Sequence, residues 1–155
     1  MADIFDDFQS LIRRLNRKQI DYAVCGGWAM AIHGLPRATV DVDLLVLSEN
    51  LSAAWETAAE LGYSVEGLPI SFDEGALEIR RISKIDEESK TLFTIDFLLV
   101  TESLKRVWET RERIDFEADE VWTVSREGLI FMKTMSGRPR DIEDIERLQE
   151  IENES

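Results

Sequence analysis

Two acidic residues separated by a single apolar residue interrupt an otherwise apolar segment of this chain. The pair is Asp41 and Asp43, within residues 40–47, and an earlier apolar run ends at the glycine pair Gly26 and Gly27. Successive side chains of a β-strand point to opposite faces, so a strand here places both carboxylates on one face. Adjacent carboxylates repel each other unless a cation joins them. The pattern therefore favours folds in which a strand presents two acids close to a glycine turn.

The glycine pair adds a second constraint. Backbone N–H groups at the start of a short helix over residues 27–32 can face an anionic phosphate, because glycine has no Cβ in the way. Carboxylate oxygens suit Mg²⁺, which keeps several waters and is usually completed by substrate phosphates. Together the two motifs predict metal-dependent phosphate chemistry.

In order, spacing and local context, these motifs resemble the nucleotidyltransferase superfamily. That superfamily includes DNA polymerase beta, the minimal antitoxin and antibiotic nucleotidyltransferases, and the abortive-infection nucleotidyltransferase toxins. The matching residues are Cys25-Gly26-Gly27, His33-Gly34-x-x-Arg37-x-Thr39 and Asp41-Val42-Asp43. The resemblance implies a small mixed sheet flanked by helices, with the carboxylates on adjacent strands.

Hydrophobic periodicity also predicts an α/β (α+β) fold with a mixed sheet. We expect helices over residues 3–18, 27–32, 50–61 and 125–135 and from residue 139 onward, and strands over 21–25, 40–47, 77–82 and 92–100. The last two strands are expected to pair across the polar turn 86–89, and residues 114–116 are expected to form a hairpin with 121–124. At 155 residues the chain is expected to be one nucleotidyltransferase-like domain (1–155). Its core spans about residues 20–100, and its C-terminal helical segment about residues 125–151.

Helix ends and faces give more detailed expectations. Asn50 or Ser52 is expected to cap the helix that follows them, and the helix that begins at Ser125 is expected to end at Gly137. In the last helix an apolar stripe is expected to face the core, formed by Ile142, Ile145, Leu148 and Ile151.

The resemblance implies a third acidic residue on a later strand, and Asp96 in the apolar segment 92–100 is the candidate. An unpaired carboxylate there costs several kcal/mol to bury, so another charge must compensate it. Either an arginine does so, or Asp41, Asp43 and Asp96 together hold Mg²⁺ or Mn²⁺. In the second case an acceptor hydroxyl attacks the α-phosphorus of a nucleoside triphosphate, in the two-metal arrangement.

Further nucleotide contacts are implied near the first motif. Gly26 and Gly27 are expected to meet the β and γ phosphates, with Arg37 and Thr39 within reach of the triphosphate. Arg37 is equally explained as a surface arginine that offsets local acidity. For His33 a structural hydrogen bond is favoured over a role as general base.

Residues 128–145 are similar to the C-terminal helical segment of abortive-infection-type nucleotidyltransferases. By that resemblance Lys133 contacts a phosphate or the nucleotide, and Asp141 or Asp144 is its partner. The position of Asp141 near a helix N-terminus is equally explained by the helix dipole. The 4 tryptophans can stack on a base, but aromatic residues are more often part of a core.

The charge balance limits the partners. With 18 basic and 32 acidic residues the formal charge is −14, which disfavours long nucleic acid. We expect a nucleoside triphosphate and an acceptor that is a protein, a small molecule or an RNA end, and a partner protein is a further candidate. No apolar run approaches the roughly 20 residues that span a bilayer, and the N-terminus is acidic where a signal peptide is basic. A cytoplasmic protein without membrane contact is expected.

The sequence is also compatible with two other functions. One is a non-catalytic nucleotide-binding or toxin–antitoxin partner protein of the same fold. The other is a toxin that modifies a host tRNA, which the acidic charge disfavours.

Overall fold

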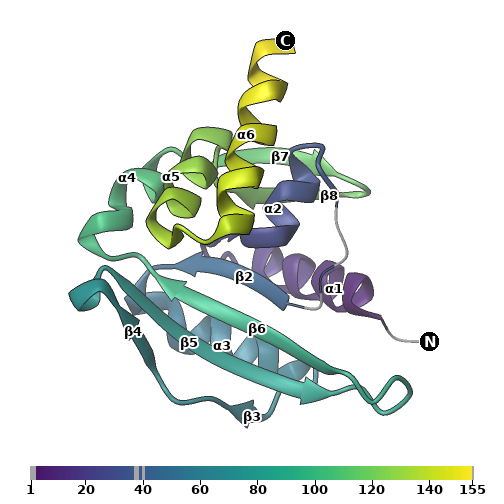
Figure 1. Ribbon diagram of the computed structural model, residues 1–155. Helices are drawn as coiled ribbons and strands as arrows, with labels where there is room; N and C mark the ends of the chain where they lie inside the picture. The colour runs from purple at the N-terminus through teal and green to yellow at the C-terminus, as the bar shows by residue number, and fades with distance from the viewer. Residues whose placement is uncertain (1–2, 37–38, 40, 155) are drawn as a thin grey trace.

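An eight-stranded mixed sheet forms the framework of the computed structural model, which describes residues 3–36, 39 and 41–154 (Figure 1). The strands are β1 (Ala23–Cys25), β2 (Asp41–Val46), β3 (Val65–Glu66), β4 (Ile70–Phe72), β5 (Leu77–Ile85), β6 (Leu92–Leu99), β7 (Glu112–Phe116) and β8 (Asp119–Thr123). Their order is β3-β5-β6-β2-β1-β8-β7, and β4 also pairs with β5. The predicted mixed sheet is confirmed, since β2–β6 and β1–β8 are parallel and β1–β2, β5–β6 and β7–β8 are antiparallel.

The two central strands, β2 and β6, position the acidic residues. Both are nearly continuous apolar runs, as expected for strands covered on both faces. They pair in parallel, with Asp41 opposite Thr94 and Asp43 opposite Asp96. Because side chains alternate along a strand, all three carboxylates belong to one face of the sheet.

Helices cover the sheet on both sides. They are α1 (Ile4–Arg17), α2 (Gly26–Ile32), α3 (Leu51–Glu60), α4 (Lys105–Glu109), α5 (Arg126–Ser136) and α6 (Pro139–Glu154). In Figure 1, α2, α5 and α6 gather above β2 and β6, whereas α3 lies on the opposite side of the sheet. The end of α1 joins α3 through Lys18, whose Nζ lies 2.8 Å from Glu60 Oε2. Among the described residues, no helix is both long and apolar enough to cross a membrane.

Several helix ends confirm the local signals. Asp3 caps α1 by accepting a hydrogen bond from the backbone N–H of Asp6 at 2.9 Å. Ser125 caps α5 in the same way, with the N–H of Gly128 at 2.9 Å. Gly137 ends α5 with φ of 63°, the left-handed conformation typical of a helix C-terminus.

The start of α3 differs from the prediction. Asn50 precedes the helix but its side chain makes no capping hydrogen bond, and Ser52 lies inside the helix. The reason is a 3₁₀ turn over Ser48–Asn50 that leads directly into α3. The short elements β3, β4 and α4 were also not predicted, because each is too short to show a hydrophobic period.

The predicted apolar stripe of α6 is wrong at its first position. Ile142 is 55% exposed, whereas Asp141, Asp144 and Leu148 are buried. The buried face of α6 therefore starts with two carboxylates, and the cation that accepts them comes from α5.

Candidate active site

Three acidic side chains from adjacent strands line one cavity of about 600 Å³. Asp41 and Asp43 come from β2, and Asp96 comes from β6, directly beside Asp43. Asp96 is buried, Asp43 is partly buried and Asp41 is exposed at the end of its strand. Small-molecule sites usually have volumes of roughly 300–1,000 Å³, so this cavity has the size of a ligand site.

Gly26 lies against Asp43 and lines the same cavity. Its φ is 64°, in the left-handed region that favours glycine. A Cβ on this residue would lie 2.9 Å from Asp43 Cγ and would overlap Asp43 Oδ2. Backbone conformation and the close approach of a carboxylate therefore both require glycine at this position.

A guanidinium group from β5 pairs with the most buried of the three carboxylates. Arg81 lies opposite Asp96 in the antiparallel β5–β6 pairing. Its Nε donates to Asp96 Oδ1 at 2.7 Å, and its Nη2 donates to Oδ2 at 2.9 Å. Such two-bond pairs are among the stronger hydrogen-bonded contacts in proteins. An arginine thus compensates the charge of Asp96, which was one of the two alternatives expected from sequence. Asp96 nevertheless lines the cavity together with Asp41 and Asp43.

The pKa values of both acids on β2 are raised at this site. Burial, followed by the negative charges of Asp96 and Asp41, raises the pKa of Asp43 to about 7. Burial and then the charge of Asp96 raise the pKa of Asp41. The charge of Arg81 opposes both shifts. Because Arg81 only partly offsets this repulsion, the site favours binding of a further cation.

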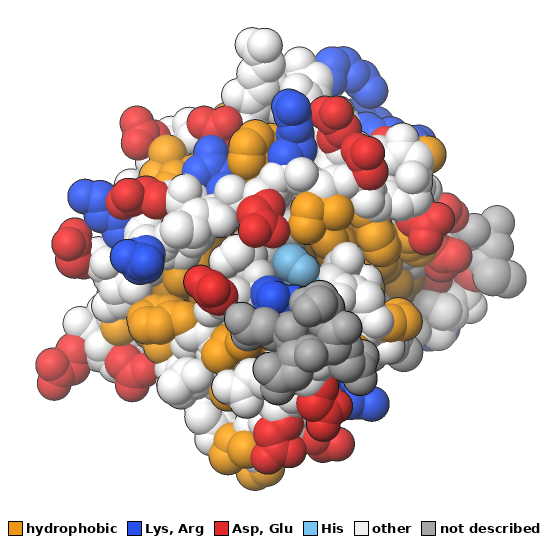
Figure 2. Space-filling model, turned by 90° about the horizontal axis from the view of Figure 1, so that it is seen from above, with side chains coloured by type: hydrophobic (Ala, Val, Ile, Leu, Met, Phe, Trp, Pro, Cys, Tyr) orange, Lys and Arg blue, Asp and Glu red, His pale blue; other side chains and the backbone are white. Residues whose placement is uncertain are grey.

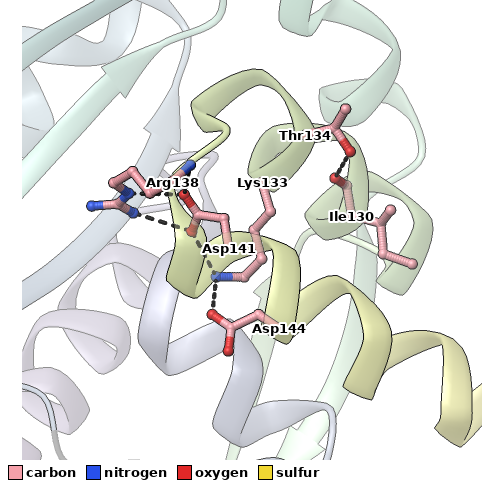
Figure 3. A network of polar contacts seen from close by, with 6 residues as sticks. All are labelled: Ile130, Lys133, Thr134, Arg138, Asp141 and Asp144. Atoms are coloured by element: carbon pink, nitrogen blue, oxygen red, sulfur yellow. Dashed lines mark hydrogen bonds and ion pairs between the residues drawn. The ribbon is translucent and has the colours of Figure 1, made fainter.

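Helices α5 and α6 add a buried network of opposite charges (Figure 3). Lys133 Nζ donates to Asp144 Oδ2 at 2.8 Å and lies 3.6 Å from Asp141 Oδ1. Arg138 Nε donates to Asp141 Oδ2 at 2.8 Å, and the backbone N–H of Arg138 donates to the same oxygen at 3.2 Å. Burial alone would raise the pKa of Asp141, but hydrogen bonds from Arg138 and Ser136 lower it to about 2. Asp141 therefore both pairs with Lys133 and caps the N-terminus of α6, as the acid of a capping box does.

The rest of the cavity wall combines apolar side chains with charged ones of both signs, among them Lys133, Asp73 and Asp141. Its apolar side chains come from the sheet and from α5, and include Leu77, Ile79, Leu98, Leu129, Met132 and Met135. Arg138 and Arg140 also line it. The Arg138 side chain is 61% exposed despite its bond to Asp141, and Arg140 is exposed. Two cationic groups thus stand at the open side of the acidic cavity.

Two other predicted nucleotide contacts, Gly27 and Thr39, do not line this cavity. In the part of the chain that is described, the lining includes Gly26 but neither Gly27 nor Thr39. These two residues are neighbours, and Thr39 Oγ1 donates to the backbone oxygen of Asp41 at 3.1 Å. Arg37 lies outside the described residues.

His33 and Trp28 have structural roles. His33 Nε2 donates to the backbone oxygen of Val124 at 2.8 Å, which confirms the predicted structural hydrogen bond. Trp28 stacks on Phe8 with 4.4 Å between ring centroids. Within the described residues no tryptophan lines the cavity, so base stacking by these residues has no support.

Sequence reasoning missed Arg81 and Arg138, although each left a signal. A buried acid such as Asp96 needs a cation on a neighbouring strand, and Arg80 and Arg81 lie on the strand predicted to pair with it. Only the pairing register decides between the two arginines. For Arg138, the signal was Asp141, an acid three residues later at the start of a helix. This is the spacing between the two members of a capping box.

The carboxylate oxygens of this site are ligands that divalent cations such as Mg²⁺ prefer. They do not, however, form a complete, preformed metal site. Among the residues described, no three acidic, histidine or cysteine side chains converge closely enough to hold a metal ion. Mg²⁺ commonly binds through one or two carboxylates together with water and substrate phosphates. Asp41 and Asp43 supply such carboxylates, and Gly26 leaves the space beside Asp43 free of a side chain. The residues therefore fit a cation that is completed by phosphate oxygens.

Solved structures with the same fold include enzymes that modify antibiotics. TM1012, a proposed nucleotidyltransferase from Thermotoga maritima, has a TM-score of 0.63 at 15% identity over 97% of this chain and 93% of its own. The lincosamide antibiotic adenylyltransferase LnuA, bound to lincomycin, has a TM-score of 0.64 at 11% identity over 96% and 98%. ANT(2'')-Ia in complex with adenylyl-2''-tobramycin has a TM-score of 0.62 at 16% identity over 91% and 84%. At these identities the likeness shows the fold.

The family is shown by sequence. No curated protein matches the chain. A family model, however, matches residues 1–153, nearly the whole sequence. The chain therefore belongs to the family described as nucleotidyltransferase of unknown function (DUF6036).

Proposed function

We propose that the protein transfers a nucleoside monophosphate from a nucleoside triphosphate to a hydroxyl acceptor, in a reaction that depends on Mg²⁺ or Mn²⁺. The observation that carries this proposal is the meeting of Asp41, Asp43 and Asp96 in one cavity beside Gly26. Membership in a nucleotidyltransferase family supports the reaction class.

In this proposal the acids hold the divalent cation and the cationic groups bind the phosphates. Asp41 and Asp43 are the primary ligands, and Asp96 is the third. When bound, the cation stabilises charge on the phosphates and lowers the pKa of the acceptor hydroxyl. Arg138 and Arg140 face the cavity and suit phosphate oxygens.

The bond changes follow from the acceptor's attack. The acceptor oxygen bonds to the α-phosphorus while the bond from that phosphorus to the α–β bridging oxygen breaks. Pyrophosphate leaves, and the hydroxyl proton passes to solvent or to a carboxylate at the site.

The remaining predicted contacts take supporting roles. Lys133 and Asp141 act through the buried network and fix Arg138 at the cavity wall. Gly27 stays a candidate contact for the β and γ phosphates, and Arg37 and Thr39 stay candidate contacts for the triphosphate.

The charge distribution favours a small nucleotide over long nucleic acid as substrate. Figure 2 shows acidic side chains over much of one face, with basic ones between them. With a formal charge of −14, the surface repels a polyanion, while Arg138 and Arg140 provide cations locally. The lincomycin bound to LnuA makes small hydroxyl compounds the first acceptors to screen, before proteins and RNA ends.

Pyrophosphate release from each of the four nucleoside triphosphates, with Mg²⁺ and with chelator, tests the proposal. We expect Mg²⁺-dependent release that falls by about 100-fold or more in Asp41→Asn/Asp43→Asn. Asp115→Asn, which removes one exposed carboxylate on the distant β7, should keep the wild-type rate. Equal rates in wild type and the double variant would contradict the proposal. Metal-dependent triphosphate binding without pyrophosphate release, with all acceptor classes supplied, would favour the non-catalytic alternative.

A further inference from the structure

Arg80 and Arg81 are neighbours on β5, and their side chains lie on opposite faces of the sheet. Arg81 lines the acidic cavity and binds both oxygens of Asp96. Arg80 points to the other face, where it lines a smaller cavity with Trp55 of α3 and lies 3.4 Å from Glu78. Alternation along the strand thus brings one guanidinium of the pair to the acidic residues and directs the other away from them.

The charges around Arg81 explain why its side chain lies there. Asp43 and Asp96 are paired positions on adjacent strands, and Asp41 is on the same face. Like charges at such spacing destabilise the fold unless a cation lies among them. Arg81 meets this need through two N–H···O bonds, one to each oxygen of Asp96.

The two members of this ion pair differ in their freedom to move. The Arg81 side chain is 45% exposed, whereas that of Asp96 is 9% exposed. Asp96 is held in the centre of a strand, but the guanidinium can swing into the open cavity and become hydrated. Of the two partners, Arg81 is the one that can leave.

We propose that Arg81 takes the place of a divalent cation while the site is free of metal, and that metal binding breaks the two hydrogen bonds from its guanidinium group to Asp96. This proposal rests on the metal-dependent function proposed above, and it assigns to Arg81 the role of a positioning residue. Arg81 keeps the carboxylates in place before metal binds. By occupying both Asp96 oxygens and repelling a second cation, it also weakens metal binding. Once released, the guanidinium faces the part of the cavity proposed to hold the triphosphate.

Metal affinity and thermal stability of the Arg81→Gln variant test the proposal together. Mn²⁺ binding is measured by electron paramagnetic resonance, and melting is followed in chelator and in saturating Mn²⁺. Arg80→Gln is the matched control, because it removes the same charge from the same strand on the other face. We expect Arg81→Gln to bind Mn²⁺ roughly three- to tenfold more tightly, the size of a partly exposed charge–charge interaction. Its melting midpoint should fall in chelator and recover in Mn²⁺, whereas Arg80→Gln should show neither effect.

The possible failures are distinguishable. If the wild type binds Mn²⁺ and Arg81→Gln binds it no more tightly than Arg80→Gln does, the proposal about Arg81 is wrong while the proposed function stands. If the wild type binds no Mn²⁺, the metal site of the proposed function is wrong, and the role of Arg81 with it. If Arg81→Gln does not fold in chelator, Arg81→Lys is tested in its place, because it keeps the positive charge but cannot form the two parallel hydrogen bonds of the guanidinium group. We expect its midpoint to drop in chelator and to recover in Mn²⁺, and an equal drop in both conditions would overturn the proposal.

Discussion

At the scale of single residues, Gly26 and Asp43 constrain each other. Replacing Gly26 by alanine imposes a positive φ on a residue with a Cβ, which costs roughly 1 kcal/mol. It also drives that Cβ into the Asp43 carboxylate. We expect Gly26→Ala to lower the free energy of unfolding by about 2 kcal/mol or more and to weaken Mn²⁺ binding.

Gly34→Ala is the control for this prediction. Gly34 also has a positive φ, of 96°, but among the described residues no atom outside its chain neighbours lies within 4 Å of a Cβ placed on it. Its loss should be limited to the conformational cost, with unchanged Mn²⁺ affinity. Urea unfolding and metal titration of both variants measure the difference. Equal losses in the two variants would show that the Asp43 contact has no effect.

The raised pKa of Asp43 predicts a pH-dependent cost to stability. An acid whose pKa is higher in the folded state, here about 7 against an ordinary 3.8, favours folding when protonated. Its contribution is fully present below about pH 4 and is lost as the pH rises to about 7 and above. We therefore expect Asp43→Asn to be more stable than the wild type at pH 8, by about 1–2 kcal/mol once solvent screening is allowed for. At pH 4 the two should be nearly equal. Thermal unfolding in chelator at both pH values tests this, and a constant difference would contradict it.

At the scale of elements, buried ion pairs join α5 and α6. Lys133 is buried between Asp144 and Asp141. Removing one partner of a buried ion pair takes away part of the charge compensation of the other. We expect Lys133→Met to lower the free energy of unfolding by about 3–5 kcal/mol, and the addition of Asp144→Asn to restore part of that loss.

Thr134→Ala is the matched control on the same helix. Thr134 points away from the network in Figure 3, and its hydroxyl donates to the Ile130 backbone oxygen at 2.8 Å, so its loss should stay within about 0.5 kcal/mol. Urea unfolding of the three variants gives the comparison. A cost for Lys133→Met as small as that for Thr134→Ala would show that the network contributes little to stability.

At the scale of the whole molecule, triphosphate binding should stabilise the fold only when a divalent cation is present. A ligand that binds only the folded state at a hundredfold excess over its Kd adds about 3 kcal/mol. For a chain of this length that corresponds to a rise in melting midpoint of about 5–10 °C. We expect this rise with Mg²⁺ and a triphosphate together, and little with either alone. A thermal shift series with Asp41→Asn/Asp43→Asn and Asp115→Asn as comparisons checks it, and an equal rise in chelator would contradict the role of the metal.

Much of the fold was readable from sequence because its signals are local. Asp3, Ser125 and Gly137 each act on the backbone within a few residues, so the ends of α1 and α5 could be predicted. The period of two along residues 40–47 placed Asp41 and Asp43 on one face, and their shared cavity agrees with that placement. The β5–β6 and β7–β8 hairpins followed from apolar runs separated by polar turns.

The sequence by itself determined which side chains share a strand face and where most helices begin and end, since these properties depend on neighbours in the chain. Only the tertiary structure decided that Arg81, and not Arg80, meets Asp96, because strand register depends on pairing between residues 15 positions apart. It also decided that α6 buries Asp141 and Asp144 in place of Ile142, because Lys133 of α5 supplies the opposite charge there. Contacts of this kind are set by packing between elements, and a periodic pattern within one element cannot specify them.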